Sequence, residues 1–356
     1  MNNSIDYQSL KAALISRVMF LRQKCDSGLK SNNPRFVVND KIVRPDGKEI
    51  KRRKIILTGT GCCIPTCTMC PFPNKSNHKG EIVEQVRKAL SSGGLTGIEQ
   101  ISLYNDGSFF APAEISETEQ LEIAKILKKL PIKILSLESL PQFIIKDRLE
   151  KFKKALGNNI NLEIGIGLQS ADHFVREVCI NSSFSNNVFE NSIQLMKDLN
   201  IIPKIYILIK APFLSEEEAI NDALNSLEYL KKLHIKYVTV CPVRVVEGTL
   251  VWDLYQRGLY VPPNLWTVYK ILKEAPSGLQ IRVAGANLTQ DDFNSILPHS
   301  CLKCNQKMIA ALTEYKDKKD LTRFPKCNCQ NDFNSDSAVI NPEKVAARIT
   351  DYLAKD

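Results

Sequence analysis

Short β-type runs alternate with longer amphipathic stretches along the middle of the chain. The runs that we expect to be strands begin at Lys54, Gln100, Ile132, Leu162, Lys204 and Lys236, with a helical pattern in each gap. One of the helices starts at Ser116 with Glu119 three residues on, a capping box. Such alternation implies parallel strands joined by right-handed crossovers. It predicts an α/β fold, a partial TIM-like (β/α)6 barrel, with a doubly wound sheet as the alternative.

The two ends of the chain depart from this alternation. Residues 1–50 are interpreted as an N-terminal extension, a helix followed by a hairpin with Asp46-Gly47 as its turn. The predicted barrel occupies residues 51–285. Residues 286–356 form a cysteine-rich C-terminal extension that ends in a further predicted helix.

Composition is that of an ordinary folded protein. Hydrophobic residues make up 44% and charged residues 24% of the 356 residues, which excludes a disordered or fibrous chain. No apolar run approaches the ~20 residues that cross a bilayer, so we expect no membrane partner. The first residues lack the basic start of a signal peptide. We therefore expect a cytoplasmic protein with reduced cysteines.

Cysteines give the sharpest chemical signal. The chain has 11 of them, and an odd number of clustered thiols indicates metal sites and not disulfides. The first group, Cys63-x3-Cys67-x2-Cys70, directly follows the first predicted barrel strand. Three thiolates on one loop can hold three irons of a [4Fe-4S] cluster and leave the fourth iron open. Zinc is the alternative metal, and the neighbouring Cys62 does not fit the spacing.

A second group lies in the tail, as Cys301-x2-Cys304 followed by Cys327-x-Cys329. Two close pairs of this kind can place four thiolates on one metal, and a closed set of four is typical of structural zinc. An auxiliary iron–sulfur cluster is the alternative. We therefore expect a metal site in the C-terminal extension.

Polar residues gather where the predicted strands end, which is where a parallel barrel carries its chemistry. The residues picked out in this way are Asn105, Asp106, Gly107, Ser108, Glu138, Ser139, Gln169, Ser170, Lys210 and Cys241. A charge that ends a buried strand, as Lys210 does, is more typical of function than of packing. Tyr206 and Cys241 are more typical of core positions.

The cluster spacing after the first barrel strand resembles that of the radical S-adenosylmethionine (SAM) superfamily. Longer segments resemble, in order and spacing, the radical-SAM subunit of archaeosine synthase, among them SLYNDGSFFAPAEIS, LEIGIGLQSADHFVREVCINSSF and YILIKAPFLSEEEAINDALNSL. More distantly they resemble the radical-SAM module of the Elongator catalytic subunit. The resemblance covers roughly Lys54 to Gln330. Two segments near expected substrate surfaces depart from the family pattern, GCCIPTCTMCPFPN and LPHSCLKCNQ.

The resemblance implies roles for residues at the strand ends. Cofactor-binding roles fall on Asn105, Asp106, Gly107 and Ser108 for the SAM amino group, on Glu138, Gln169 and Ser170 for the ribose, and on Arg176 for the carboxylate. A guanidinium fork suits a carboxylate, and a helix-surface arginine is the alternative for Arg176. Lys210, Tyr206 and Cys241 are the candidates for substrate contact and catalysis.

The resemblance also implies a reaction and its partners. In such enzymes a reduced cluster gives one electron to SAM, and the resulting 5′-deoxyadenosyl radical abstracts a hydrogen from the substrate. The implied substrate is a tRNA whose 7-deazaguanine base carries a lysine, which is cleaved to leave a formamidine. The implied partners are the synthase subunit that attaches the lysine and a reductant such as flavodoxin or ferredoxin.

Two other functions remain open at this point. A stand-alone radical SAM enzyme for a small molecule in natural-product biosynthesis is favoured by the two departures from the family pattern. A non-catalytic RNA-binding subunit does not explain the SAM-type loops. The net charge of +9 and two basic stretches favour RNA, although such charges are often only solvated: Lys51, Arg52, Arg53 and Lys54, and Lys303, Lys307, Lys316, Lys318, Lys319 and Arg323.

Overall fold

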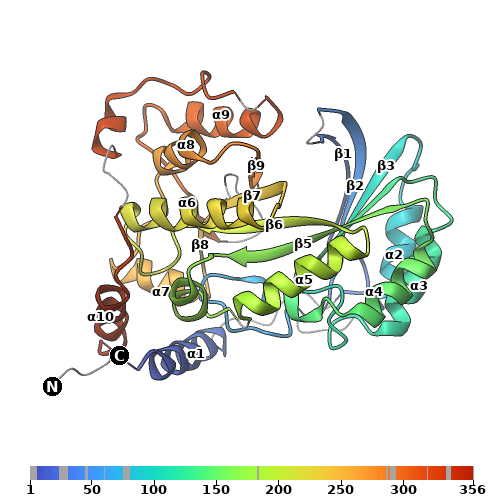
Figure 1. The fold of residues 1–356 in the computed structure, drawn as a ribbon, viewed down its shortest axis with the longest axis horizontal. Helices are drawn as coiled ribbons and strands as arrows, with labels where there is room; N and C mark the ends of the chain where they lie inside the picture. Colours follow the sequence, from blue (N-terminus) through green and yellow to red (C-terminus); the bar gives the residue numbers. More distant parts are fainter. Residues whose placement is uncertain are drawn as a thin grey trace.

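An eight-stranded sheet that curls into an open half-barrel forms the centre of the protein, with helices along its outer side (Figure 1). Neighbouring strands follow the order β1-β2-β3-β4-β5-β6-β7-β9. The computed structural model describes residues 6–23, 31–44, 47–59, 61–74, 81–182, 184–285, 288, 294–318, 320–333 and 338–355.

The strands from β2 onwards are parallel to their neighbours. They are β2 (Glu49–Ile56), β3 (Ile98–Tyr104), β4 (Ile134–Ser139), β5 (Asn161–Gln169), β6 (Ile202–Ile209), β7 (Tyr237–Pro242) and β9 (Gln280–Val283). The six predicted strands correspond to β2 to β7, so the prediction of a partial (β/α) barrel is confirmed. β9 adds a parallel strand that the sequence pattern did not reveal.

Each crossover between parallel strands carries a helix on the outer side of the sheet. These helices are α2 (Ile82–Ser91), α3 (Glu117–Leu127), α4 (Lys146–Leu156), α5 (Asn186–Asp198), α6 (Glu216–Lys232) and α8 (Leu265–Glu274). The predicted capping box is present at the start of α3, where Ser116 and Glu119 bond each other's backbone N–H groups. An equivalent box between Ser215 and Glu218 starts α6.

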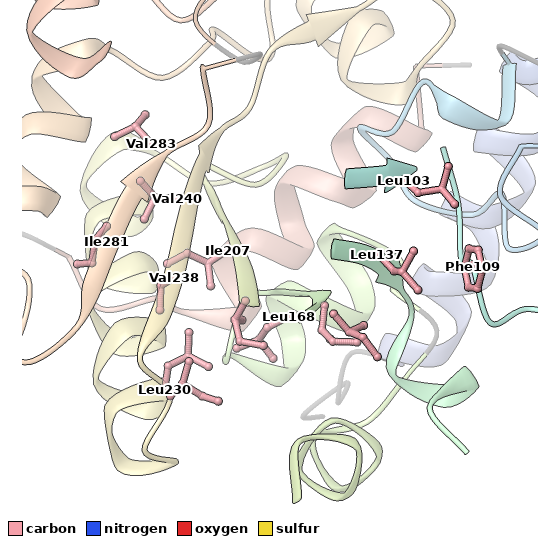
Figure 2. Packing of buried hydrophobic residues seen from close by; sticks show 14 of the residues in the cluster. Leu103, Phe109, Leu137, Leu168, Ile207, Leu230, Val238, Val240, Ile281 and Val283 are labelled. Atoms are coloured by element: carbon pink, nitrogen blue, oxygen red, sulfur yellow. The ribbon is translucent and has the colours of Figure 1, made fainter. Parts of the chain in front are cut away.

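Two faces of the sheet have opposite character because successive residues of a strand point to opposite sides. The outward face packs on the helices, and Figure 2 shows part of this apolar layer, with Leu103, Leu137, Leu168, Ile207 and Val240 among the labelled residues. The residues that alternate with them point to the inward face, and many of them are polar or glycine: Ser102, Ser136, Glu138, Gly165, Gly167, Lys204, Tyr206 and Cys241. The half-barrel therefore has a dry outer layer and a polar interior.

The predicted hairpin before the barrel is also present. β1 (Phe36–Val43) pairs with β2 in antiparallel register, so β2 belongs both to the hairpin and to the parallel sheet. Gly47 has a φ of 82°, which suits the turn, whereas Asp46 lies outside the described residues.

The helices near the two ends of the chain lie together. α1 (Tyr7–Gln23), α7 (Leu250–Gln256) and α10 (Pro342–Leu353) share a second apolar core, and α1 and α10 are side by side in Figure 1. Arg17 on α1 pairs with Asp253 on α7 at 2.9 Å, and the Tyr352 hydroxyl on α10 donates to the same carboxylate at 2.7 Å. The N-terminal helix is thereby attached to the C-terminal one.

The C-terminal extension begins with β10 (Ser295–Ile296), which pairs with β8 (Val245–Val246). α9 (Asn305–Lys318) then packs against α8 and β9, at the upper left of Figure 1. Within the described ranges, no helix has the length and apolar character needed to cross a bilayer.

Candidate functional site

Because β2 to β7 are parallel, the loops that follow them meet at one edge of the half-barrel. Backbone contacts join these loops directly. The N–H of Phe109 donates to the carbonyl of Glu138 at 2.9 Å, and the N–H of Leu140 donates to the Ser108 hydroxyl at 3.0 Å. The predicted site residues after β3 and β4 are therefore neighbours.

Glu114 joins the cysteine loop to the loop after β3. Its buried carboxylate accepts hydrogen bonds from the N–H of Cys63 at 2.9 Å, the side-chain amide of Asn105 at 2.9 Å and the N–H of Ser108 at 2.6 Å. A Cβ on Gly107 would lie 2.0 Å from a Glu114 oxygen, so only glycine leaves room for this carboxylate. Burial raises the pKa of Glu114 in spite of these bonds. The sequence reasoning did not identify Glu114.

Arg22 holds the cysteine loop from the other side. From the last turn of α1, its guanidinium donates to the carbonyls of Pro65 at 2.7 Å, Cys67 at 3.0 Å and Cys70 at 2.9 Å. The loop is braced further by Thr68, whose N–H and hydroxyl donate to the carbonyls of Ile180 and Cys179. The path of the loop is thus fixed by its backbone, independently of its thiols.

The thiols of the first group differ in exposure. Cys63 is exposed, whereas Cys62, Cys67 and Cys70 are partly buried. Burial raises the pKa of Cys67 to about 12, and the nearby Arg22 acts in the opposite direction. Within the adjacent pair, it is Cys62 whose thiol interacts electrostatically with Cys67 and Cys70, whereas the Cys63 thiol interacts with Glu114.

The three cysteine thiols of this loop are suitable ligands for a [4Fe-4S] cluster. Three cysteines lie on one braced loop at the strand-end edge. Among the buried polar groups without partners in the described residues are the Ser139 hydroxyl at the end of β4 and the Asn181 amide. Asn181 adjoins the loop, because its carbonyl accepts from the Thr66 hydroxyl at 3.0 Å. Polar groups of this kind suit a polar ligand such as SAM.

A second set of predicted residues meets on the inward face below this edge. The Tyr206 hydroxyl on β6 donates to Glu138 on β4 at 2.8 Å, crossing over β5. The crossing requires Gly165, because a Cβ there would lie 2.7 Å from the Tyr206 ring and 3.0 Å from Glu138. Burial raises the pKa of Glu138 and, to about 12, that of Cys241, whose thiol also interacts with Glu138. Glu138, Tyr206 and Cys241 thus form one cluster.

Three of the predicted residues have left-handed backbone at strand ends. The φ angles are 56° for Asp106, 69° for Gln169 and 64° for Lys210. Non-glycine residues held in this region are strained, and such strain concentrates at functional sites. The side chains of Asp106 and Lys210 are both paired, Asp106 with Arg35 and Lys210 with Glu216 at 2.7 Å.

Ser170 and Arg176 hold the loop after β5 in place. The buried Ser170 hydroxyl donates to Asp222 on α6, and burial raises the pKa of that carboxyl to about 7. Arg176 is fully buried and donates to the carbonyl of Ser170 at 3.0 Å. The alternative of a helix-surface arginine is therefore wrong, because the guanidinium lies inside the loop. Contact of Arg176 with a SAM carboxylate stays a prediction.

Two of the four residues of the first basic stretch, Arg52 and Arg53, are part of the scaffold, whereas Lys51 is exposed. Arg53 is 1% exposed and donates to the carbonyls of Ala89 at 3.1 Å and Gly94 at 3.1 Å, near the end of α2. Arg52 pairs with Asp40 across the hairpin. Successive strand residues point to opposite faces, so Arg52 and Arg53 lie on opposite sides of the sheet. Arg53 binds carbonyl groups that have no partner within the helix.

The second basic stretch is only partly described. Lys303 and Lys307 are exposed. Arg323 pairs with Glu314 at 3.1 Å and with Asp320 at 3.4 Å. The side chains of Lys316 and Lys318, and the whole of Lys319, lie outside the described residues.

Comparison with known proteins gives relatives of similar length. No family model matches the chain. It is 29% identical over 304 residues to an uncharacterized protein of Methanocaldococcus jannaschii, covering 80% of this chain and 81% of that protein. It is 23% identical over 303 residues to archaeosine synthase subunit beta of Methanosarcina acetivorans, covering 80% and 84%. Among solved structures, Elp3 of Methanocaldococcus infernus aligns with a TM-score of 0.49 and 18% identity, over 67% of this chain and 59% of that chain.

These relatives cover most of the chain. The predicted resemblance to archaeosine synthase subunit beta is confirmed: this chain is similar over most of its length to those of Methanosarcina acetivorans and Thermococcus kodakarensis.

Proposed function

We propose that this protein is a radical SAM enzyme whose cluster is held by Cys63, Cys67 and Cys70. The observation that carries the proposal is the braced three-cysteine loop at the strand-end edge, next to buried polar groups without partners in the described structure. A [4Fe-4S] cluster with SAM at its open iron supplies the one-electron cleavage of SAM that starts radical chemistry. In the tail, the four cysteines hold a separate metal.

The protein's own residues position and shield this chemistry. Arg22 and Glu114 fix the two sides of the cysteine loop. Asn105, Gly107 and Ser108 form the adjoining wall, where backbone and small polar groups face an amino group. Glu138 and Tyr206 close the interior below with a hydrogen-bonded pair that is partly buried. Lys210 is held by Glu216, and we propose that it keeps the loop after β6 in its strained form.

The proposed substrate is a tRNA base of the archaeosine type, a 7-deazaguanine that carries a lysine, and the reaction cleaves the lysine side chain. The likeness to archaeosine synthase subunit beta supports this assignment. The enzyme works with the subunit that attaches the lysine and with a flavodoxin or ferredoxin as reductant. Lys303 and Lys307 in the tail are exposed, and we propose that they contact phosphates.

A small-molecule substrate is the second candidate, and one observation favours it. Arg52 and Arg53, half of the expected basic run at β2, are engaged within the fold, which reduces the charge available for RNA. A small polar substrate would instead depend on the interior cluster of Glu138, Tyr206 and Cys241.

The test is SAM cleavage by anaerobically reconstituted protein with dithionite, followed by an assay on two substrates. We expect 5′-deoxyadenosine from wild-type protein and none from the Cys67→Ala variant. A lysine-modified tRNA should be consumed in proportion to SAM, and binding to bulk tRNA should weaken steeply between low and high salt. SAM cleavage without tRNA binding or consumption, in the presence of the partner subunit, would contradict the tRNA assignment and favour the small molecule.

A further inference from the structure

The four cysteines of the tail converge on one point, although they lie on either side of a helix. Cys301 and Cys304 precede α9, and Cys327 and Cys329 follow it. Their Sγ atoms are 3.5 Å apart for Cys301 and Cys304, 3.6 Å for Cys301 and Cys327, 3.6 Å for Cys304 and Cys329, and 3.4 Å for Cys327 and Cys329. All four Sγ atoms lie within 4.8 Å of one another.

These separations decide between one ion and an iron–sulfur cluster. Zinc–thiolate bonds of about 2.3 Å in tetrahedral geometry place the sulfurs about 3.8 Å apart. The separations here are slightly below that value. In a [4Fe-4S] cluster each cysteine binds a different iron, which requires thiolates that stand further apart. A disulfide needs about 2.05 Å between sulfurs, so the four thiols are also not paired with each other.

Polar groups around the sulfurs complete the arrangement. The Trp266 indole N–H on α8 donates to the Sγ of Cys329 at 3.2 Å. The Ser300 hydroxyl contacts the Sγ of Cys304 at 3.3 Å. Hydrogen bonds of this kind orient metal ligands and are part of metal sites in general. Trp266 is 3% exposed and belongs to the main core, so the cysteine group is connected to the barrel wall.

We propose that Cys301, Cys304, Cys327 and Cys329 hold a single tetrahedral zinc ion, which fixes the tail to α8. Four protein ligands leave no open position, so the ion is structural and takes no part in the reaction. It closes a loop that contains all of α9, and through Trp266 it attaches that loop to the outer wall of the half-barrel. The proposal does not depend on the identity of the substrate.

Metal analysis of the full chain tests the site separately from the catalytic cluster. We expect one zinc per chain in the wild type, the same content in Cys67→Ala protein, and none in Cys304→Ser protein. Replacement of the zinc by Co²⁺ in wild-type protein should give the visible absorption of a tetrahedral thiolate complex, which needs no variant to fold. Iron and sulfide bound to Cys67→Ala protein, or wild-type protein without zinc and without a cobalt complex, would overturn the proposal.

The role of Trp266 has a matched control in the chain's other tryptophan, Trp252 on α7. Trp266→Phe removes the N–H donor to Cys329 and should weaken zinc affinity about 10-fold in competition with a chelator. Trp252→Phe should leave the affinity unchanged. In Trp252→Phe protein, removal of zinc should also change the fluorescence of the remaining Trp266. Equal affinities in both variants and no fluorescence change would contradict the attachment of the ion to α8.

Discussion

The two cysteine groups of this chain use the same side chain in opposite ways. In the tail, the thiols themselves converge, and their sulfurs lie 3.4 to 3.6 Å from their nearest partners. In the loop of residues 61–70, backbone carbonyls are fixed by Arg22 and one N–H by Glu114, while the thiols stay separate. In a closed site for one ion, the position of the ligand atoms themselves is fixed. In an open site for a cluster, the backbone of the loop that carries the ligands is fixed.

The difference also separates stability from chemistry. Loss of the tail ion would loosen α9 and residues 320–329, because the metal closes that loop. Loss of the first cluster would leave the loop after β2 in place, because Arg22 and Thr68 bind its backbone. Variants of the tail cysteines should therefore change folding, whereas variants of the first cysteine group should change activity.

The largest effect is expected at the adjacent cysteines of the first group. The spacing assigns Cys63 as the third ligand, yet it is Cys62 that interacts electrostatically with Cys67 and Cys70. We expect Cys63→Ala to lose the cluster, about four irons, and all SAM cleavage, because Cys63 has the spacing of a cluster ligand and its thiol is exposed. Cys62→Ala should keep both. Iron content and 5′-deoxyadenosine formation are measured for both variants. Loss of both in Cys62→Ala protein and not in Cys63→Ala protein would make Cys62 the third ligand.

A smaller effect is expected for Arg22, which positions the loop without being a ligand. Arg22→Leu removes three hydrogen bonds from a charged donor and should lower the free energy of unfolding by about 2 kcal/mol. The reconstituted cluster should lose iron several-fold faster to a chelator, because its loop is less rigid. Arg22→Lys keeps the charge but not the forked guanidinium, so its rate of iron loss should lie between those of the wild type and Arg22→Leu. Unchanged iron loss in Arg22→Leu would show that the cluster alone fixes the loop.

The sequence was most informative where the pattern is local. β2 to β7 follow from runs of alternating or buried apolar residues, and the start of α3 follows from Ser116 and Glu119. β9 was missed because it has only four residues, Gln280–Val283. The four tail cysteines were found because their pairs are close in sequence, but their separations, which distinguish an ion from a cluster, are set by the packing of α9.

Residues that act at long range left no signal in the sequence. Arg22 contacts carbonyls more than 40 positions away, and Glu114 contacts an N–H that is 51 positions away. The buried position of Arg53 was also not predictable from the sequence. Its basic neighbours suggest an RNA surface, but strand alternation points it to the helix-covered face of the sheet, where it binds carbonyl groups around the end of α2. Charge in a sequence predicts a charged surface only where the side chain reaches solvent.

A moderate effect is expected at Gly165, where the inward face of the sheet has no room for a side chain. Gly165→Ala places a Cβ 2.7 Å from the Tyr206 ring, so the ring must move and its hydrogen bond to Glu138 should break. We expect SAM cleavage to fall about tenfold with a destabilisation of about 1–3 kcal/mol. Gly285→Ala is the control, because a Cβ there meets nothing within 4 Å. Equal activity of the two variants would remove Glu138 and Tyr206 from the proposed site.

The smallest effect is a pH dependence of stability at the loop after β5. Burial raises the pKa of Asp222 to about 7, well above the usual range of an aspartate, so the folded state retains a proton that the unfolded state loses. Stability from this group is fully present below pH 4 and is lost as the pH rises from about 4 to 7. Asp222→Asn keeps a partner for the Ser170 hydroxyl and removes the titration, so it should flatten this part of the profile. Urea unfolding between pH 5 and 8 measures the effect. A wild-type profile that rises with pH in this range, or an identical profile in Asp222→Asn protein, would show that the carboxyl is ionised in the fold.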